Sequence, residues 1–167
     1  MEYLGIYNDE GKATDKKVIR GEKLELEENE HIAVAIIFIE NSEGKFLIQK
    51  ASKEKGSYFS STGGHIDFGE TPLSTIKKEV EEELGVNISN DEIIDLGYSN
   101  YGKPLIFLYY IKKDINLAEI ILQKEEVDYV EYMTIDEINK LIEEDKMLKS
   151  HAEMFKRVLN EKVSIEK

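Results

Sequence analysis

The order of apolar segments predicts an α/β protein, with one mixed sheet covered by helices on its faces. Two runs of β-branched and aromatic residues, 32–39 and 104–111, are typical of strands buried on both sides. An amphipathic helix is expected between them, at 72–84. With 167 residues and no repeat or second core, the chain is expected to form a single domain, 1–167.

The N-terminal segment predicts a β-hairpin added to this core. Strands are expected at 3–7 and 17–20, because the Asn, Asp and Gly residues of 8–11 are typical of a turn. The acidic stretch 22–30 is expected to be a solvated connection. Residues 1–30 are therefore interpreted as an N-terminal hairpin extension.

The remaining elements follow from apolar periodicity and turn residues. A turn at 41–44 and a polar, lysine-bearing loop at 51–57 separate the next segments. The further strands are expected at 45–50, 93–96 and 129–133, and the further helices from Ile135 and at 147–161.

The helix at 72–84 has clear limits. Thr71 supplies a capping hydroxyl, Pro72 suits the first helical position, and Gly85 is a stop signal. Its apolar residues recur at helical spacing and predict a buried stripe. The stripe consists of Leu73, Ile76, Val80 and Leu84.

An acidic face adjoins this stripe. Glu79, Glu82 and Glu83 stand three and four residues apart, whereas Glu81 points toward solvent. These carboxylates repel one another near the negative end of the helix dipole, and a hard cation such as Mg²⁺ would relieve that cost. The alternative is an acidic face that is merely solvated.

The segment 64–86 resembles the Nudix hydrolase signature, G-x5-E-x7-R-E-U-x-E-E-x-G-U, in which U is a bulky aliphatic residue. The resemblance implies a Nudix-type α/β/α sandwich. The usual arginine is replaced by Lys78, which keeps the charge but loses the planar, two-pronged donor geometry. The matching positions are Gly64, Glu70, Glu79, Val80, Glu82, Glu83, Gly85 and Val86.

The flanking sequence is similar to the Nudix branch related to type I isopentenyl-diphosphate isomerase. The similarity spans about 3–86 and rests on the hairpin, His31, Leu-Ile-Gln-Lys at 47–50 and His65. The isomerase reaction needs a cysteine, and the chain has none. A hydrolase on an isomerase-like frame is therefore expected.

The resemblance assigns roles to the acidic residues. Glu79, Glu82 and Glu83, with the Gly64 carbonyl, are the candidate ligands of Mg²⁺, for which Mn²⁺ is an expected substitute. The ion would bridge a diphosphate and activate a water for attack at phosphorus. Glu83 and Glu126 are equal candidates for the general base, and Glu82 is a catalytic residue chiefly as a ligand.

Several other residues are candidates for substrate contacts. Lys50, His65 and Lys78 are the candidate substrate-binding residues, although a solvated lysine or a supporting histidine is the alternative. Glu70 is expected to brace the loop and helix. Two other histidines are given structural roles: His31 at a strand start and His151 at the surface of a terminal helix.

Composition limits the function classes. The absence of cysteine excludes a disulfide scaffold, a thiolate zinc site and cysteine catalysis. The net charge of −13 argues against nucleic acid or an anionic membrane as partner. Neither a signal peptide nor an anchor is visible, so a cytoplasmic protein is expected.

The predicted function is hydrolysis of a diphosphate linkage in a small phosphorylated substrate, with nucleoside diphosphates and their derivatives as leading candidates. One alternative is a weakly active Nudix domain that binds a nucleotide or regulates a partner. Another is a nucleic-acid-end hydrolase, which the acidic balance disfavours. Family resemblance also suggests a homodimer. Candidate base-stacking residues are Tyr58, Phe59, Tyr98 and Tyr101.

Overall fold

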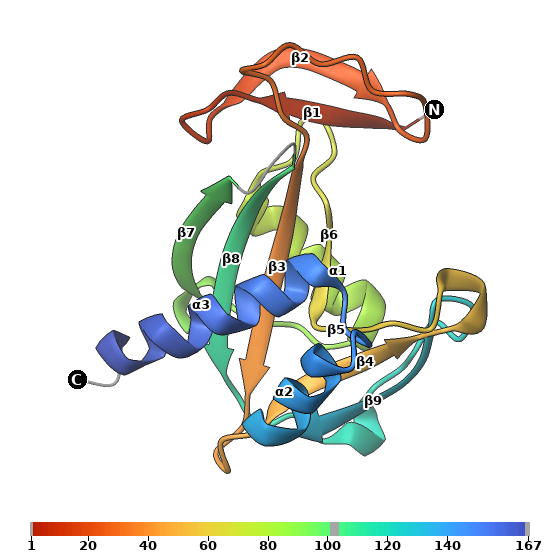
Figure 1. Ribbon diagram of the computed structural model, residues 1–167, viewed down its shortest axis with the longest axis vertical. Helices are drawn as coiled ribbons and strands as arrows, with labels where there is room; N and C mark the ends of the chain where they lie inside the picture. Colours follow the sequence, from red (N-terminus) through yellow and green to blue (C-terminus); the bar gives the residue numbers. More distant parts are fainter. Residues whose placement is uncertain (1, 101–103, 166–167) are drawn as a thin grey trace.

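The computed structural model describes residues 2–100 and 104–165 and shows a helix-covered sheet with a separate hairpin at one end (Figure 1). The hairpin is a two-stranded antiparallel sheet of β1 (Tyr3–Tyr7) and β2 (Ala13–Ile19). It has a small core of its own, in which Leu4 and Ile6 pack with Ile32. The predicted N-terminal hairpin is confirmed, although its second strand starts earlier than expected.

The main sheet has seven strands in the path β5-β4-β3-β8-β7, with β6 paired to β3 and β9 paired to β4. The pairing of β3 with β8 is parallel and the other pairings are antiparallel, so the sheet is mixed, as predicted. The strands are β3 (Ala33–Glu40), β4 (Phe46–Ala51), β5 (Phe59–Ser60), β6 (Thr62–His65), β7 (Ile94–Asn100), β8 (Leu105–Lys112) and β9 (Val127–Met133).

Helices cover both faces of this sheet. Helix α1 (Pro72–Leu84) packs on one face, and α2 (Ile135–Glu143) and α3 (Lys149–Ile165) pack on the other. Figure 1 shows α3 crossing in front of the sheet and α1 behind it. The predicted α/β/α sandwich is therefore confirmed. Across the residues that the structure describes, three short 3₁₀ turns are also present: Lys53–Lys55, Asn90–Glu92 and Leu117–Glu119.

The central strand β3 explains why two layers of helix form. Its side chains alternate between the faces, so Ala35 and Ile37 meet the α1 side while Ile36 and Phe38 meet the α3 side. All four are at most 2% exposed. A strand that is apolar from residue 33 to residue 39 needs cover on both faces, which is the pattern that the sequence predicted.

Helix α1 begins and ends where the sequence predicts. The Thr71 hydroxyl accepts a hydrogen bond from the Ser74 N–H at 3.0 Å, and the Ser74 hydroxyl accepts one from the Thr71 N–H at 2.9 Å. This reciprocal capping box satisfies two backbone donors at the helix start. Gly85 ends the helix with φ of 70°, a left-handed conformation that glycine adopts at low cost.

The hairpin is fixed to the loop that precedes α1. The Gly5 N–H donates to the Ile66 carbonyl at 3.3 Å, and the Phe68 N–H donates to the Tyr3 carbonyl at 2.9 Å. On the other side, Tyr7 and His31 exchange two backbone hydrogen bonds of 2.7 and 2.9 Å. The extension therefore contacts the signature segment and does not hang from the domain as a free arm.

Two short strands, β5 and β6, were not predicted. β6 contains Gly63 and Gly64 and lacks the alternating apolar pattern by which strands are found in a sequence. It forms because its backbone pairs with β3, from Ile37 opposite Thr62 to Val34 opposite His65.

In the described part of the chain, no helix is both long and apolar enough to cross a membrane.

The aromatic cluster beneath α3 provides a test of this packing. Phe155 is fully buried, and its ring centroid lies 5.6 Å from that of Phe38 and 5.2 Å from that of Phe46. We expect Phe155→Ala to lower the free energy of unfolding by about 3–5 kcal/mol, because the ring leaves a cavity. Urea unfolding would measure the loss. Ile121→Ala, at a side chain 74% exposed, should change stability by less than about 0.5 kcal/mol, and equal effects would contradict this packing.

Candidate active site

Glu79 lies directly against the glycine that opens the signature. A Cβ atom built on Gly64 would stand 2.6 Å from Glu79 Cδ and 2.7 Å from its Oε1, closer than atoms can approach. The absence of a side chain at residue 64 therefore makes room for the carboxylate. At Gly63 a Cβ atom would instead stand 2.5 Å from the Ala35 carbonyl oxygen, so that glycine is needed for strand pairing.

Glu83 lies one turn further along α1, and its carboxylate is only partly hydrogen-bonded. It accepts hydrogen bonds from the Gln49 side chain and from the Gly63 backbone N–H. The Gln49 carbonyl oxygen in turn accepts from the Thr62 hydroxyl at 3.4 Å. Glu83 Oε2 is buried and has no hydrogen-bond partner among the described residues. An unpartnered buried carboxylate oxygen is costly, and it is a suitable ligand atom for a cation.

The electrostatics of these two glutamates are unfavourable to their charged forms. Burial, followed by the charge of Glu82, raises the pKa of Glu79 from 4.5 to about 7, while Lys78 and Arg20 oppose the rise. Burial, followed by the charge of Glu79, raises the pKa of Glu83 to about 8. The charge of Glu126 also raises the pKa of both groups.

The donor set suits a hard divalent cation in its chemistry. It consists of carboxylate oxygens, one of them buried without a partner, on groups whose raised pKa values a positive ion would lower. Glu82 is exposed on α1, and Glu126 is exposed in the loop before β9. Within 2–100 and 104–165, however, no three acidic or histidine side chains already converge as a metal cage. The described residues therefore fit a divalent cation in the type and charge of their donor atoms.

Gln49 was not among the predicted site residues. The alternation of side chains along β4 could have indicated it. Leu47 packs toward α1, and Gln49, two residues later, points to the same side. A polar residue on the buried face of a strand requires a partner, and here the partner is Glu83.

Lys50 points away from the glutamates. Its Nζ lies 5.7 Å from the centroid of the Phe59 ring, and it borders a hollow of about 380 Å³ together with Tyr58, Phe59 and Asp145. The structure therefore does not bring Lys50 together with Glu79 and Glu83. Its predicted role in substrate binding stays a prediction.

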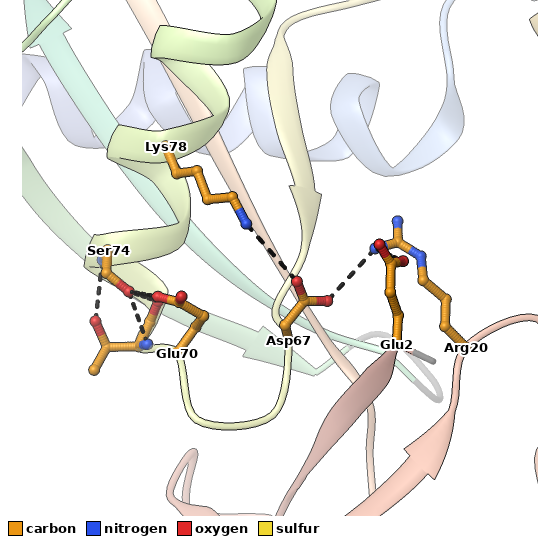
Figure 2. A network of polar contacts seen from close by, with 7 residues as sticks. Glu2, Arg20, Asp67, Glu70, Ser74 and Lys78 are labelled. Carbon is orange, nitrogen blue, oxygen red and sulfur yellow. Dashed lines mark hydrogen bonds and ion pairs between the residues drawn. The ribbon is translucent and has the colours of Figure 1, made fainter.

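The loop before α1 carries a polar network that reaches the hairpin (Figure 2). Asp67 stands between two cations, with Oδ2 at 3.9 Å from Lys78 Nζ and Oδ1 at 3.5 Å from Arg20 Nη1. Glu70 accepts a hydrogen bond of 2.6 Å from the Ser74 hydroxyl, which joins the loop to the first turn of α1. Lys78 and Glu70 thus both lie on the loop and helix where the sequence placed them.

The histidines occupy three different environments. His31 is 4% exposed and its Nε2 lies 2.6 Å from Asp9 Oδ1, within the hairpin junction. The prediction that His151 lies at the surface is wrong: it is buried on α3, where its Nδ1 accepts from the Ser61 N–H at 3.2 Å and lies 2.8 Å from the Ser61 hydroxyl oxygen. Burial lowers the pKa of His151 to about 4, so it is neutral at pH 7. His65, the last residue of β6, borders a cavity.

This cavity has a volume of about 830 Å³ and lies on the α3 face of the sheet. Gly63, Gly64 and His65 form one wall, and residues at the start of α3 form another. The remaining lining is mainly aliphatic, with Val34, Ile36, Pro104, Ile106 and Leu148.

The predicted stacking residues lie elsewhere. Tyr58 and Phe59 border the smaller hollow, and the Tyr98 hydroxyl donates to the Asp9 carbonyl at 2.9 Å. Tyr101 is outside the described residues.

The chain was compared with known families and proteins. A NUDIX domain model matches residues 29–158. An uncharacterized Nudix hydrolase of Listeria monocytogenes is 32% identical over 145 residues, which cover 84% of this chain and 85% of that protein.

Solved structures share the fold. DR0079 from Deinococcus radiodurans has a TM-score of 0.78 at 21% identity, covering 93% of this chain and 98% of that chain. A bifunctional NMN adenylyltransferase/ADP ribose pyrophosphatase from Francisella tularensis, complexed with AMP and a manganese ion, has a TM-score of 0.59 at 16% identity. The match covers 78% of this chain and 42% of that chain. At these identities the likeness concerns the fold alone.

The two neighbouring glycines provide a matched pair of variants. We expect Gly64→Ala to displace the flexible Glu79 carboxylate, at a cost in stability of about 1 kcal/mol or less, and to weaken Mg²⁺ binding by at least about 10-fold. Gly63→Ala meets the rigid backbone of Ala35 and should cost about 2 kcal/mol or more. Urea unfolding and calorimetric titration with Mg²⁺ would measure both effects. Unchanged Mg²⁺ binding in Gly64→Ala would contradict the role given to this contact.

The raised pKa of Glu83 predicts a pH dependence of stability without metal. The folded protein holds this proton more tightly than the unfolded chain does, so the free energy of unfolding should fall as pH rises from about 4.5 to about 8. Glu83→Gln cannot ionise and should be more stable than the parent at about pH 8, by on the order of 2 kcal/mol.

Urea unfolding in a chelator, at about pH 5 and about pH 8, would measure this difference. Glu81→Gln, at an exposed position of the same helix, is the control and should keep the slope of the parent. A parent whose stability does not fall between these pH values would refute the assignment.

Proposed function

The chain belongs to the Nudix hydrolase family, and from that premise we propose that it hydrolyses the diphosphate linkage of a nucleoside diphosphate derivative at the face formed by Glu79 and Glu83. The match over 29–158 supports the family, whose members hydrolyse nucleoside diphosphate derivatives. The proposed site rests on one observation: Glu79 and Glu83 have raised pKa values, and Glu83 Oε2 is buried without a hydrogen-bond partner among the described residues.

Mg²⁺ is the proposed cofactor, with Mn²⁺ as a substitute. Glu79 and Glu83 would hold the ion, with Glu82 from the exposed side of the helix and the Gly64 carbonyl as further ligands. A bound divalent ion would neutralise charge at phosphorus and lower the pKa of a water. The manganese ion in the Francisella structure supports this choice of metal through the shared fold.

Glu83 and Glu126 differ in what they are able to do. Glu83 is fixed by Gln49 and Gly63, and its remaining oxygen is buried, which suits a ligand more than a base that must exchange protons with solvent. Glu126 has an exposed side chain on a loop whose backbone is fixed, because the Ser52 N–H donates to the Glu126 carbonyl at 3.0 Å. We therefore assign proton abstraction from the attacking water to Glu126, and we assign metal binding to Glu83.

The organic part of the substrate is assigned to the large cavity. Gly64 contacts Glu79 and also lines the cavity, so a diphosphate at the glutamates would extend past His65 into the aliphatic pocket. The nucleoside diphosphate derivatives that members of the family hydrolyse support a nucleotide-derived substrate. Lys78 would contact the phosphates, and Glu70 would brace the loop through Ser74.

Finer features of the chain stay predictions. The similarity to the isopentenyl-diphosphate isomerase branch is one of them. It rests on His31, residues 47–50 and His65, in a chain that belongs to a hydrolase family. Homodimer formation, a cytoplasmic location and the exclusion of nucleic acid and membrane as partners also stay predictions.

The function is tested by phosphate release from a panel of nucleoside diphosphate derivatives, with and without Mg²⁺, after a coupled phosphatase step. We expect turnover that requires Mg²⁺ or Mn²⁺ and falls by about 100-fold or more in Glu83→Gln and Glu126→Gln, because each removes a charge acting on the reacting groups. Glu81→Gln is the control. Glu82→Gln should also reduce turnover through weaker metal binding.

Metal binding separates the two assigned roles. Glu83→Gln should weaken the rise in melting temperature that Mg²⁺ causes, whereas Glu126→Gln should keep it. A panel without any metal-dependent turnover, despite stabilisation of the parent by Mg²⁺, would contradict the hydrolase assignment and favour a binding module.

A further inference from the structure

The N-terminal hairpin places a guanidinium beside the signature loop. Arg20 follows β2, and its backbone N–H donates to the Glu2 carbonyl at 3.0 Å. Its Nη1 lies 3.5 Å from Asp67 Oδ1 and 3.6 Å from Glu2 Oε2. Figure 2 shows Arg20 and Lys78 approaching Asp67 from opposite sides, one from the hairpin and one from α1.

The backbone of the hairpin fixes this position. Leu4 pairs with Asp67 in an isolated antiparallel bridge, and the hydrogen bonds of Gly5 to Ile66 and of Phe68 to Tyr3 flank it. The Lys17 Nζ also lies 5.2 Å from the centroid of the Phe68 ring. The base of the Arg20 side chain is thus fixed relative to the loop that leads into α1.

The contacts of Arg20 are too weak to explain its presence as stabilisation. Charge-assisted hydrogen bonds are typically about 2.7–2.9 Å long, and exposed ion pairs contribute about 0–1 kcal/mol. Those of Arg20 are longer, and its side chain is 44% exposed. Both contacts use Nη1, whereas a guanidinium carries five donors arranged to suit carboxylate and phosphate oxygens.

Arg20 lies close to the cavity wall and to the signature helix. Its partner Asp67 follows the cavity residue His65 by two positions, and Asp67 also pairs with Lys78, which precedes Glu79 on α1. Glu79 contacts Gly64, and Gly64 and His65 together form one wall of the cavity. A diphosphate that joins a group in the cavity to the metal site would therefore pass beside Arg20.

We propose that Arg20 binds the diphosphate of the substrate, with Asp67 holding the guanidinium in place until the substrate arrives. The signature position that usually carries arginine is Lys78 here, so the hairpin supplies the two-pronged donor at this site. The inference rests on the proposed function and extends it to a substrate-binding residue outside the signature. It also gives the N-terminal extension a part in recognition.

Steady-state kinetics of four variants would test the role. We expect Arg20→Ala to raise KM by about 10-fold while kcat changes by less than about 3-fold, and Arg20→Lys to restore part of the loss. Asp67→Asn should leave KM within about 2-fold of the parent, or lower it, because the guanidinium is released. Lys16→Ala, which removes an ion pair with Glu30 on the same hairpin, is the matched control.

A merely structural role of Arg20 gives a different pattern. If Arg20 acted only by holding the loop through Asp67, Asp67→Asn would reproduce the loss seen in Arg20→Ala. That result would overturn the proposal, as would an unchanged KM in Arg20→Ala.

Binding without turnover separates this inference from the proposed function. Imidodiphosphate, a diphosphate that resists hydrolysis, should raise the melting temperature of the parent in the presence of Mg²⁺, and Arg20→Ala should lose at least about half of that rise. If the parent hydrolyses nothing on the panel but shows this Arg20-dependent stabilisation, the inference stands and the hydrolase assignment fails. If imidodiphosphate does not stabilise the parent, the inference is overturned.

Discussion

The confinement of two like-charged carboxylates against a pair of glycines is the constraint on which the rest of the structure depends. Glu79 occupies the space that a side chain on Gly64 would need, and Glu83 takes a hydrogen bond from the Gly63 N–H. Burial disfavours the charged form of each glutamate, and the charges of neighbouring carboxylates add to this cost, so each favourable contact around the pair partly offsets it. Gln49 donates to one glutamate, and Lys78 and Arg20 act on the other. A bound cation, as proposed, would complete this compensation.

The same glycines explain how one site can serve both faces of the sheet. Side chains normally fill the space on both faces of a strand and so separate the two layers, but Gly63 and Gly64 contribute only backbone atoms. The glutamates of α1 contact these residues, and the same two residues line the large cavity on the α3 side. The proposed substrate, which uses both regions, would pass the end of β6 at His65. The hairpin is docked on the loop that follows this end, which is why a residue so early in the chain can reach the site.

The sequence predicted what depends on periodicity and local caps, and it did not predict what depends on pairing between distant segments. Helix α1 was predicted at its observed bounds because Thr71, Pro72 and Gly85 act within a few residues of themselves. β6 could not be predicted, since its glycines carry no pattern and its order comes from β3. His151 was misplaced because a polar residue on an amphipathic helix looks exposed until Ser61, 90 positions earlier, is seen to be its partner. Gln49 and Arg20 were not predicted for the same reason: their partners lie on other elements, which the sequence alone does not place beside them.

Charge then explains why the cations are placed where they are. A chain with a net charge of −13 repels a diphosphate at long range, and salt at physiological concentration screens that repulsion beyond about 8 Å. Attraction within that distance must come from a few local groups. Asp67 is shared by Lys78 and Arg20, which holds one cation on either side of a carboxylate without burying either of them. An incoming phosphate can take over contacts that are long and solvent-exposed at little cost, whereas short buried pairs would resist it. The weakness of these ion pairs is therefore what suits them to substrate binding.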